Sequence, residues 1–343
     1  MRLTKSILLL LVGCPLLLLA CGDSGGGDVA SNSLQVGLVF DIGGRGDKSF
    51  NDSAYRGLER AQHELAVHFE YLEPTEGSDR EAGLREYASR GFDLVIGTGF
   101  MFSDDMEKMA REYPDVRFAC VDFTVKYDDA GNAQSLPANL VALKFREEEG
   151  SFLAGAAAIG VSGSKTIGFV GGMDIPLIHK FEAGYRAGAL HVAPQAKVLV
   201  RYAGVTANAF KDPAKGKELA TSMYGMGADV IYHASGTTGF GVFEAAREFD
   251  GLAIGVDSDQ YEEAPGYILT SMIKDVDVAV FDTIERVLNG DFQGGVREFG
   301  LAEDGVRIVR DDNNRNLLPD TVWQRVVSLR DSIAAGHIRV PRK

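Results

Sequence analysis

Three aspartates stand where apolar, strand-like runs of the sequence end. Asp41, Asp122 and Asp257 each come directly after such a run. A single aspartate in this place often caps the following helix or turn, but three in equivalent places favour a shared ligand crevice at the carboxyl ends of parallel strands. Because a carboxylate accepts hydrogen bonds, the expected ligand carries several O–H or N–H donors, as sugars, nucleosides and amines do.

The segment that begins with the first of these aspartates is the most informative motif of the chain. Residues 41–52 read DIGGRGDKSFND, so a carboxylate and a glycine loop lead to Phe50 and Asn51 and to an amphipathic helix that begins near Asp52. The segment lacks both the G-x-x-x-x-G-K-[ST] and the G-x-G-x-x-G patterns that hold nucleotide phosphates. We therefore expect an uncharged polar ligand here.

A second aromatic residue of interest, Phe210, lies in the polar segment 206–212. A phenylalanine in such a loop gains little unless it covers something apolar. Two facing aromatics, Phe50 and Phe210, would sandwich a flat ring. Either ring alone is more simply explained as a packing contact between two lobes.

Several weaker candidates accompany these residues. The turn Gly236-Thr237-Thr238-Gly239 places backbone donors near the start of a helix. Lys274 follows a predicted strand and is a candidate donor to a ligand oxygen. Asp174 is a fourth acid near a strand end, and His233 is better explained as a structural histidine than as a ligand contact.

The sequence carries no pattern for catalysis or for binding a metal or cofactor. The motifs G-x-S-x-G, H-E-x-x-H, C-x-x-C and S-x-x-K do not occur at plausible positions. His63 and His68 are five residues apart, which is a poor spacing for a metal pair. We therefore expect a protein that is not an enzyme and that has no cofactor or metal.

The candidate residues sit in a regular alternation of strand-like and helical segments. Apolar runs predict strands over residues 34–40, 68–72, 94–97, 117–121, 140–145, 166–170, 198–202, 230–233, 252–256, 267–271 and 306–309. Helical periodicity predicts helices over residues 53–66, 80–90, 102–112, 150–160, 179–192, 213–225, 239–248, 276–288 and 321–335. Continuous apolar strands are typical of parallel sheets buried on both faces, so the pattern predicts an α/β, doubly wound fold.

The alternation occurs twice in succession. Each unit opens with a strand that leads into a Gly-Gly turn, at Gly43-Gly44 and at Gly171-Gly172. We therefore predict two similar lobes. The predicted division is residues 34–144, completed by about 272–300, for the N-terminal lobe and residues 145–271, completed by about 301–343, for the C-terminal lobe.

The N-terminus and the charge of the chain limit where the protein works. Arg2 and Lys5 precede an apolar stretch of about fourteen residues, which is too short to span a membrane comfortably and is typical of a secretory signal over residues 1–20. Without these residues, 33 basic side chains stand against 49 acidic ones, a net charge of −16. Such a charge argues against binding to nucleic acid.

The cysteines separate into different roles. Leu18-Leu19-Ala20-Cys21 resembles the bacterial lipobox, in which Cys21 becomes the lipidated first residue of the mature protein, although an incidental cysteine after an ordinary signal is the alternative. Residues 21–33 have the small, glycine-rich composition of a flexible tether. Cys120 lies in an apolar run, so we expect it to be buried and unpaired.

Taken together, these segments resemble the basic membrane protein family of substrate-binding lipoproteins, whose best-known members are purine-nucleoside receptors of ABC importers. The resemblance covers nearly the whole folded region and is carried by residues 41–51, 145–155 (FREEEGSFLAG), 167–176 (IGFVGGMDIP), 212–216 (DPAKG), 255–260 (GVDSDQ) and 270–274 (TSMIK). It implies a type I periplasmic-binding-protein fold, in which two doubly wound lobes are joined by a hinge and hold the ligand between them.

The resemblance also implies a role for each candidate residue. These roles are stacking on the base by Phe50 and Phe210, recognition of the base by Asp41, Asn51 and Asp122, and contacts to the ribose from Gly236, Asp257 and Lys274. The chain departs from many relatives at Phe240, where they carry a small polar residue.

The implied function is that of a lipid-anchored receptor on the extracytoplasmic, periplasmic face of the bacterial cell membrane. As a monomer it would bind a purine nucleoside and deliver it to the permease subunits of an ABC importer, with Cys21 carrying the lipid and no nucleic acid as partner. A sugar receptor on the same fold is one alternative, although the only tryptophan, Trp323, lies far from the strand-end loops. A ligand sensor without transport is another, and a metal-dependent nucleoside hydrolase is a third.

Overall fold

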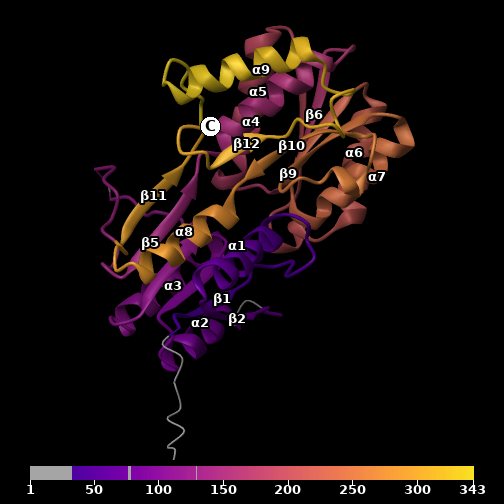
Figure 1. Ribbon diagram of the computed structural model, residues 1–343. Coiled ribbons are helices and arrows are strands. Elements are labelled where there is room, and N and C mark those ends of the chain that lie inside the picture. Colours follow the sequence, from indigo (N-terminus) through magenta and orange to yellow (C-terminus); the bar gives the residue numbers. More distant parts are fainter. Residues whose placement is uncertain (1–32, 76–78, 129) are drawn as a thin grey trace, which may run out of the picture. The chain divides into compact units, whose positions relative to one another are not determined.

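The computed structural model describes residues 33–75, 79–128 and 130–343. The predicted signal, the lipidation site at Cys21 and the tether up to residue 32 lie outside the described residues. Within residues 33–343 the chain forms two six-stranded sheets that helices cover on their faces (Figure 1). The predicted α/β, doubly wound fold is therefore confirmed.

The first sheet combines five strands from the N-terminal part of the chain with one from the C-terminal part. Its order is β11-β5-β4-β3-β1-β2, and all neighbouring strands are parallel. The strands are β1 (Gln35–Val39), β2 (His68–Leu72), β3 (Leu94–Thr98), β4 (Arg117–Val121), β5 (Leu140–Phe145) and β11 (Gly295–Phe299). The central strand β3 is buried at every residue, as a parallel sheet covered on both faces requires.

The second sheet has the order β12-β10-β9-β8-β6-β7. Its strands are β6 (Thr166–Met173), β7 (Lys197–Gly204), β8 (Val230–Ala234), β9 (Leu252–Asp257), β10 (Ile268–Lys274) and β12 (Val306–Ile308). Only the edge pair of β10 and β12 is antiparallel.

The helices divide between the two sheets. They are α1 (Phe50–Leu65), α2 (Asp79–Ser89), α3 (Ser103–Glu112), α4 (Glu147–Val161), α5 (Pro176–Val192), α6 (Pro213–Gly225), α7 (Gly239–Phe249), α8 (Val276–Leu288) and α9 (Asp320–Ala334). Helix α8 packs against α1, α4 packs against α5 and α9, and α6 packs against α7. We call the first sheet with α1, α2, α3 and α8 the N-terminal lobe, and the second sheet with the other helices the C-terminal lobe.

The chain passes between the lobes three times. The crossings lie between β5 and α4, between β10 and α8, and between β11 and β12. Two of them are very short, since β5 ends at Phe145 and α4 begins at Glu147, while β10 ends at Lys274 and α8 begins at Val276. These three connections together form the hinge between the lobes.

Every predicted strand and helix corresponds to an observed one, and the differences have clear causes. The edge strand β11 was not predicted, because its sequence GVREF is short, half-exposed and contains two charges. The predicted turn at Gly171-Gly172 is wrong, because both residues continue β6. A Cβ on either glycine would lie 2.3–2.5 Å from the ring of Phe210 or Tyr202, so these glycines make room for aromatic side chains.

Helices α4 and α5 approach each other closely because glycines face the neighbouring backbone. A Cβ on Gly155 would lie 2.0 Å from the carbonyl oxygen of Tyr185, and a Cβ on Gly188 would lie 1.9 Å from that of Phe152. Glycine inside a helix costs about 1 kcal/mol relative to alanine, and close packing of the two helices offsets this cost. The pair lies beside the first crossing, since α4 begins directly after β5.

Gly188→Ala should therefore destabilise the protein. The new methyl group would overlap backbone atoms, which cannot move aside as a flexible side chain can, so we expect a loss of about 2–3 kcal/mol in the free energy of unfolding. Urea unfolding measures this loss. Gly225→Ala is the matched control, because the space around a Cβ at the end of α6 is open. An equal loss in both variants would contradict the packing explanation.

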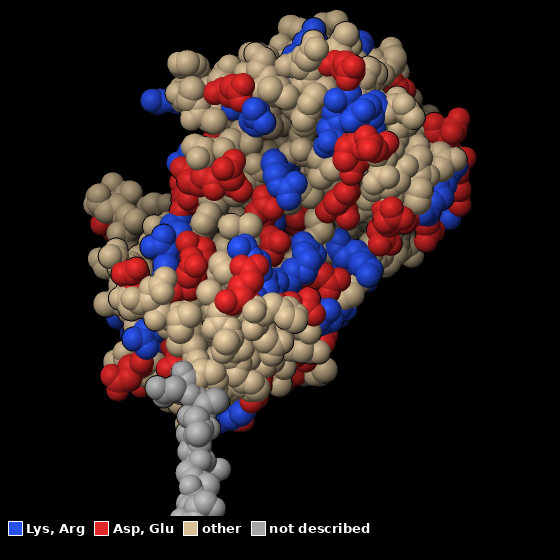
Figure 2. Space-filling view, in the orientation of Figure 1, with Lys and Arg blue, Asp and Glu red and all other residues tan. Residues whose placement is uncertain are grey.

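The buried residues confirm two further expectations. Cys120 is fully buried in β4 and forms no disulfide, and Trp323 packs half-buried against the main core. On the face shown in Figure 2, acidic and basic side chains lie beside one another, in pairs such as Arg60 with Glu64 on α1. None of the helices formed by the described residues has the length and apolar character needed to cross a membrane.

Candidate functional site

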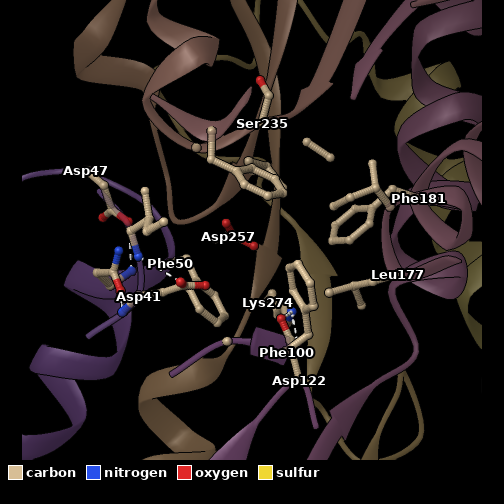
Figure 3. Close-up of a pocket in the computed structure, with 18 residues that line it drawn as sticks. Asp41, Asp47, Phe50, Phe100, Asp122, Leu177, Phe181, Ser235, Asp257 and Lys274 are labelled. Carbon is tan, nitrogen blue, oxygen red and sulfur yellow. Dashed lines mark hydrogen bonds and ion pairs between the residues drawn. The ribbon is translucent and has the colours of Figure 1, made fainter. Parts of the chain in front are cut away.

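A cavity lies between the lobes, at the carboxyl ends of the strands of both sheets. About 600 Å³ of empty space lies within it, part of which is open to solvent. Figure 3 shows Asp41 and Phe50 on one side of it, Phe181 on the other and Asp257 between them. All eight residues predicted to contact a ligand line this cavity: Asp41, Phe50, Asn51, Asp122, Phe210, Gly236, Asp257 and Lys274.

Two aspartates hold the glycine loop that leads into α1 by accepting hydrogen bonds from its backbone. Asp47 accepts hydrogen bonds of 2.8–3.1 Å from the backbone N–H groups of Ser49, Asn51 and Asp52, and so satisfies donors that a helix N-terminus leaves free. For this reason α1 begins at Phe50 and not near Asp52 as predicted. The Asp52 carboxylate accepts two further N–H groups from the loop. Asp47 lines the cavity, but its carboxylate oxygens accept hydrogen bonds from the loop and the start of α1.

Asp41 and Asn51 form one corner of the cavity. Asn51 Oδ1 accepts the Asp41 N–H at 3.1 Å, and Asp41 Oδ1 accepts the N–H of Ile42 at 2.7 Å. Asp41 Oδ2 faces Gly99, where a Cβ would lie only 2.0 Å away. Among the described residues, neither Asp41 Oδ2 nor the amide nitrogen of Asn51 has a hydrogen-bond partner. An acceptor and a donor therefore stand side by side for a ligand.

Asp257 belongs to the contact between the lobes as well as to the cavity. Its Oδ2 accepts the Ser49 hydroxyl at 2.6 Å, and Ser258 Oγ donates to the Ser49 carbonyl at 3.1 Å. Nearby, Gln260 Nε2 donates to the carbonyl of Lys48 at 3.2 Å. The loop before α1 thus reaches the end of β9, and the two lobes are in contact over the cavity.

Lys274 connects the cavity to the hinge. Its Nζ lies 2.6 Å from both carboxylate oxygens of Asp122 and 3.1 Å from Glu147 Oε1. Glu147 in turn contacts Lys180 through its other oxygen. The side chains of Asp122, Lys274 and Glu147 are at most 6% exposed, and that of Lys180 is 15% exposed. We call Asp122, Lys274, Glu147 and Lys180 the ionic chain. The charges of these four residues alternate and sum to zero, and Lys180 also lies 3.7 Å from the buried Glu148, which pairs with Arg342.

Two phenylalanines line the cavity from opposite lobes. Phe50 begins α1, and Phe210 ends a short 3-10 helix, η2 (Ala207–Phe210). The turn η3 (Gly236–Thr238) supports Phe210, because Thr237 Oγ1 donates to its carbonyl at 3.1 Å. Gly236 has φ +56°, and a Cβ there would lie 2.8 Å from the same carbonyl. Glycine is therefore required where this turn meets the cavity.

The sequence prediction missed the other lining residues. They are Ile42, Asp47, Gly99, Phe100, Leu177, Ile178, Phe181, Ala234, Ser235 and Val256. Applied to every strand, the strand-end rule that identified the aspartates would have found Phe100 after β3 and Ser235 after β8. The apolar residues of α5 gave no such signal, because an apolar stripe on a helix is typical of an ordinary core contact.

Three residues considered in the sequence lie outside the cavity. Asp174 forms an exposed pair with His179 at 2.7 Å. His233 is fully buried, with its Nε2 3.0 Å from Gln260 Oε1, and burial lowers its pKa to about 4, so the prediction of a structural histidine is confirmed. Phe240 packs near Phe243 on α7 and does not line the cavity.

Burial dominates the electrostatics of the cavity. It raises the pKa of Asp41 to about 7 and, against the pull of the Lys274 ammonium, that of Asp257 to about 6. Burial also raises the pKa of Asp122, and Lys274 opposes this rise. Burial alone would lower the pKa of Lys274, but the neighbouring carboxylates of Asp122 and Glu147 raise it above its usual value. This lysine is therefore charged.

The cavity therefore suits a neutral molecule with a flat apolar part and a polar edge. Phe50, Phe210 and Phe181 provide apolar walls, while Asp41 and Asp257 provide acceptors. The lining contains a single cation, Lys274, whose partners are carboxylates of the protein. Nothing in the described residues groups three or more histidine, cysteine or acidic side chains in a way that could hold a metal ion.

Comparison with known proteins identifies the family. The family profile described as "ABC transporter substrate-binding protein PnrA-like" matches residues 34–343. This chain belongs to the PnrA-like family of ABC transporter substrate-binding proteins. The resemblance noted in the sequence is thereby confirmed. Members of the PnrA-like family bind substrates for transport, so the expectation that the protein is not an enzyme is also supported.

Individual relatives cover nearly the whole chain. An "ABC transporter nucleoside-binding protein BmpA" of Lactococcus lactis is 32% identical, over 94% of this chain and 93% of its own length. The "Basic membrane protein A" of Borreliella burgdorferi is 33% identical, over 98% and 96%. Among solved structures, an ABC transporter solute-binding protein from Aeropyrum pernix shares 29% identity with a TM-score of 0.79, over 90% of this chain and 94% of that one. These neighbours agree with the PnrA-like assignment.

Proposed function

We propose that the protein binds purine nucleosides between its lobes. The observation that carries this proposal is that one phenylalanine from each lobe, Phe50 and Phe210, lines the same cavity as several carboxylates. A base between two aromatic rings gains about 1–3 kcal/mol per stacking contact, and carboxylates accept the N–H and O–H groups of base and ribose. The relative from Lactococcus lactis, which is named a nucleoside-binding protein, supports the same ligand class.

The family resemblance implies roles for the polar residues, and their positions are compatible with these roles. Asp41, Asn51 and Asp122 lie on the N-terminal lobe, where we propose that they read the edge of the base. Asp257 and Gly236 lie on the C-terminal lobe, at the place proposed for the ribose. Lys274 lies at the same cavity. We propose that it positions Asp122, because its ammonium group contacts both carboxylate oxygens of that residue.

We propose a working cycle in which the lobes open about the hinge, take up ligand and close over it. Contacts such as that between Ser49 and Asp257 join the lobes directly and would break on opening. Hinge closure around a ligand is a common motion of two-lobed binding proteins. Delivery to the permease subunits of an ABC importer would follow from the closed form.

The proposed location is the extracytoplasmic face of the cell membrane, with lipid on Cys21 and the protein as a monomer. The N-terminal sequence supports this proposal, and so do relatives from Pyrococcus species that are named lipoproteins, one of them 37% identical to this chain. Mass spectrometry of the protein isolated from its membrane tests it. An unmodified Cys21, or a mature protein that begins elsewhere, would contradict lipid attachment.

Isothermal titration of the purified soluble domain tests the ligand. We expect heat of binding with at least one of adenosine, guanosine and inosine, weaker binding of pyrimidine nucleosides, and none with free ribose. Ribose that binds as tightly as the best nucleoside would favour a sugar receptor instead. The absence of binding to every nucleoside would overturn the proposal.

Nucleoside binding should weaken as the pH falls from 8 to 5. Burial raises the pKa of Asp41 to about 7 and of Asp257 to about 6, and ligand donors bond to the ionised carboxylates. Protons therefore compete with the ligand below these values, by up to about tenfold per pH unit for each acid. Titration with inosine at a series of pH values measures the effect. Asp41→Asn should remove the part of the pH dependence that lies near pH 7, because Asp41 has the higher of the two pKa values. An affinity that is constant over this range would contradict the assigned contacts.

A further inference from the structure

Glu147 and Lys180 lie outside the cavity, yet they contact the residue that holds one of its acids. Glu147 is the first residue of α4, directly after a hinge crossing, and is fully buried. Lys180 lies on α5, where its neighbours Leu177 and Phe181 line the cavity, whereas its own Nζ donates to Glu147 and, at 2.5 Å, to the carbonyl of Phe145. Lys180 therefore ties α5 to the hinge crossing.

The geometry at Lys274 shows what this arrangement supports. Three carboxylate oxygens lie close to the Lys274 ammonium group. It donates to both oxygens of Asp122 at 2.6 Å, and Oε1 of Glu147 lies 3.1 Å away in an ion pair that makes no hydrogen bond. Lys274 thus acts on the cavity through Asp122, and Glu147 fixes its other side.

We propose that Glu147 and Lys180 are positioning residues for ligand binding: they hold Lys274 against Asp122, so that Asp122 presents an acceptor-only carboxylate to the ligand. The inference deepens the proposed function and rests on it. Its consequence for specificity is that the ligand must offer an N–H or O–H donor to Asp122, as the edge of a purine base can. A ligand with an acceptor at this point would face an unprotonated carboxylate.

Lys180 is essential to the balance of positive and negative charge in the ionic chain, because that chain is buried. Burial alone would raise the pKa of Glu147, but the ammonium groups of Lys180 and Lys274 lower it below its usual value. Glu147 is therefore charged. Without Lys180, two buried carboxylates would share the single ammonium of Lys274. Uncompensated buried charge is strongly unfavourable, so Lys274 would move toward Glu147 and loosen its contact with Asp122.

The first experiment needs no ligand. In protein labelled with ¹⁵N-lysine, NMR observes the buried Lys274 ammonium directly, and Lys274→Arg assigns its signal. We expect Lys180→Met to shift or broaden this signal. Lys165→Met is the matched control, because Lys165 is another lysine that donates to backbone carbonyls near α4, but at the far end of that helix. An unchanged Lys274 signal in Lys180→Met overturns the inference whether or not a nucleoside binds.

The second experiment measures affinity for the nucleoside that the wild-type protein binds best. Lys180→Met should weaken it about tenfold, while Lys180→Arg and the control Lys165→Met should stay close to wild type. The double variant Lys180→Met with Glu147→Gln should recover most of the loss, because a balanced pair of Lys274 and Asp122 remains. A double variant as weak as Lys180→Met alone would indicate a general packing defect and overturn the inference. A wild type that binds no nucleoside would instead overturn the proposed function, and the NMR result stands apart from it.

Discussion

Replacing Phe50 by alanine should weaken nucleoside binding by roughly 5- to 150-fold. Phe50 lies at the start of α1, held there by the hydrogen bonds of Asp47 to the loop, and its ring lines the cavity opposite the C-terminal lobe. The loss of one stacking contact costs about 1–3 kcal/mol, which is a factor of roughly 5 to 150 in affinity. Isothermal titration with the best-bound nucleoside measures the change.

The comparison with other phenylalanines makes this result specific. Phe210→Ala, which removes the ring of the opposite lobe, should have an effect of similar size. Phe240→Ala is the matched control, because Phe240 belongs to the same lobe as Phe210 but lies away from the cavity. If Phe50→Ala and Phe240→Ala bind equally well, the loop before α1 contributes packing between the lobes and does not contact the base.

Replacing Lys274 by methionine should abolish nucleoside binding and destabilise the protein at the same time. Methionine keeps much of the length of the side chain but removes the charge. Glu147 would still contact Lys180, whereas Asp122 would lose the only ion-pair partner found for it among the described residues. Breaking a buried ion pair from one side typically costs about 3–5 kcal/mol. Urea unfolding and titration with nucleoside measure the two effects.

The double variant Lys274→Met with Asp122→Asn separates these two effects. It removes both charges of the pair, so most of the lost stability should return, because no unpaired charge stays buried. Binding should not return, since the acceptor on the N-terminal lobe is also gone. A single variant Lys274→Met that is as stable as wild type would show that Asp122 finds another partner, or takes up a proton at no cost.

The fold was predictable from the sequence because its elements carry strong local signals. Apolar runs of four to seven residues separated by helical segments leave few arrangements other than parallel sheets with helices on both faces. The strand β11 escaped prediction because an exposed edge strand does not need an apolar sequence. The Gly171-Gly172 pair was misread because glycine can serve a turn or make room for a ring, and only the neighbouring rings of Tyr202 and Phe210 distinguish the two.

The site was predictable for a related reason. Parallel strands all end at the same edge of a sheet, so a residue that follows a strand is placed at the ligand crevice by topology alone. Asp41, Asp122 and Asp257 were found in this way, and each lines the cavity. Leu177 and Phe181 were missed because they come from a helix, whose rotation about its axis cannot be read from the order of the strands.

The sequence by itself therefore determined the type and order of the elements, the carboxylates at the strand ends, and the family to which the chain belongs. Only the tertiary structure decided how those carboxylates are partnered. Lys274 lies 152 residues from Asp122 in the sequence and 2.6 Å from it in space, and Ser49 meets Asp257 across 208 residues. Local patterns reflect hydrogen bonds and burial within a few residues of each position. The charge balance of a buried site depends on which distant segments the packed lobes bring together, and on the low dielectric that makes each pairing matter.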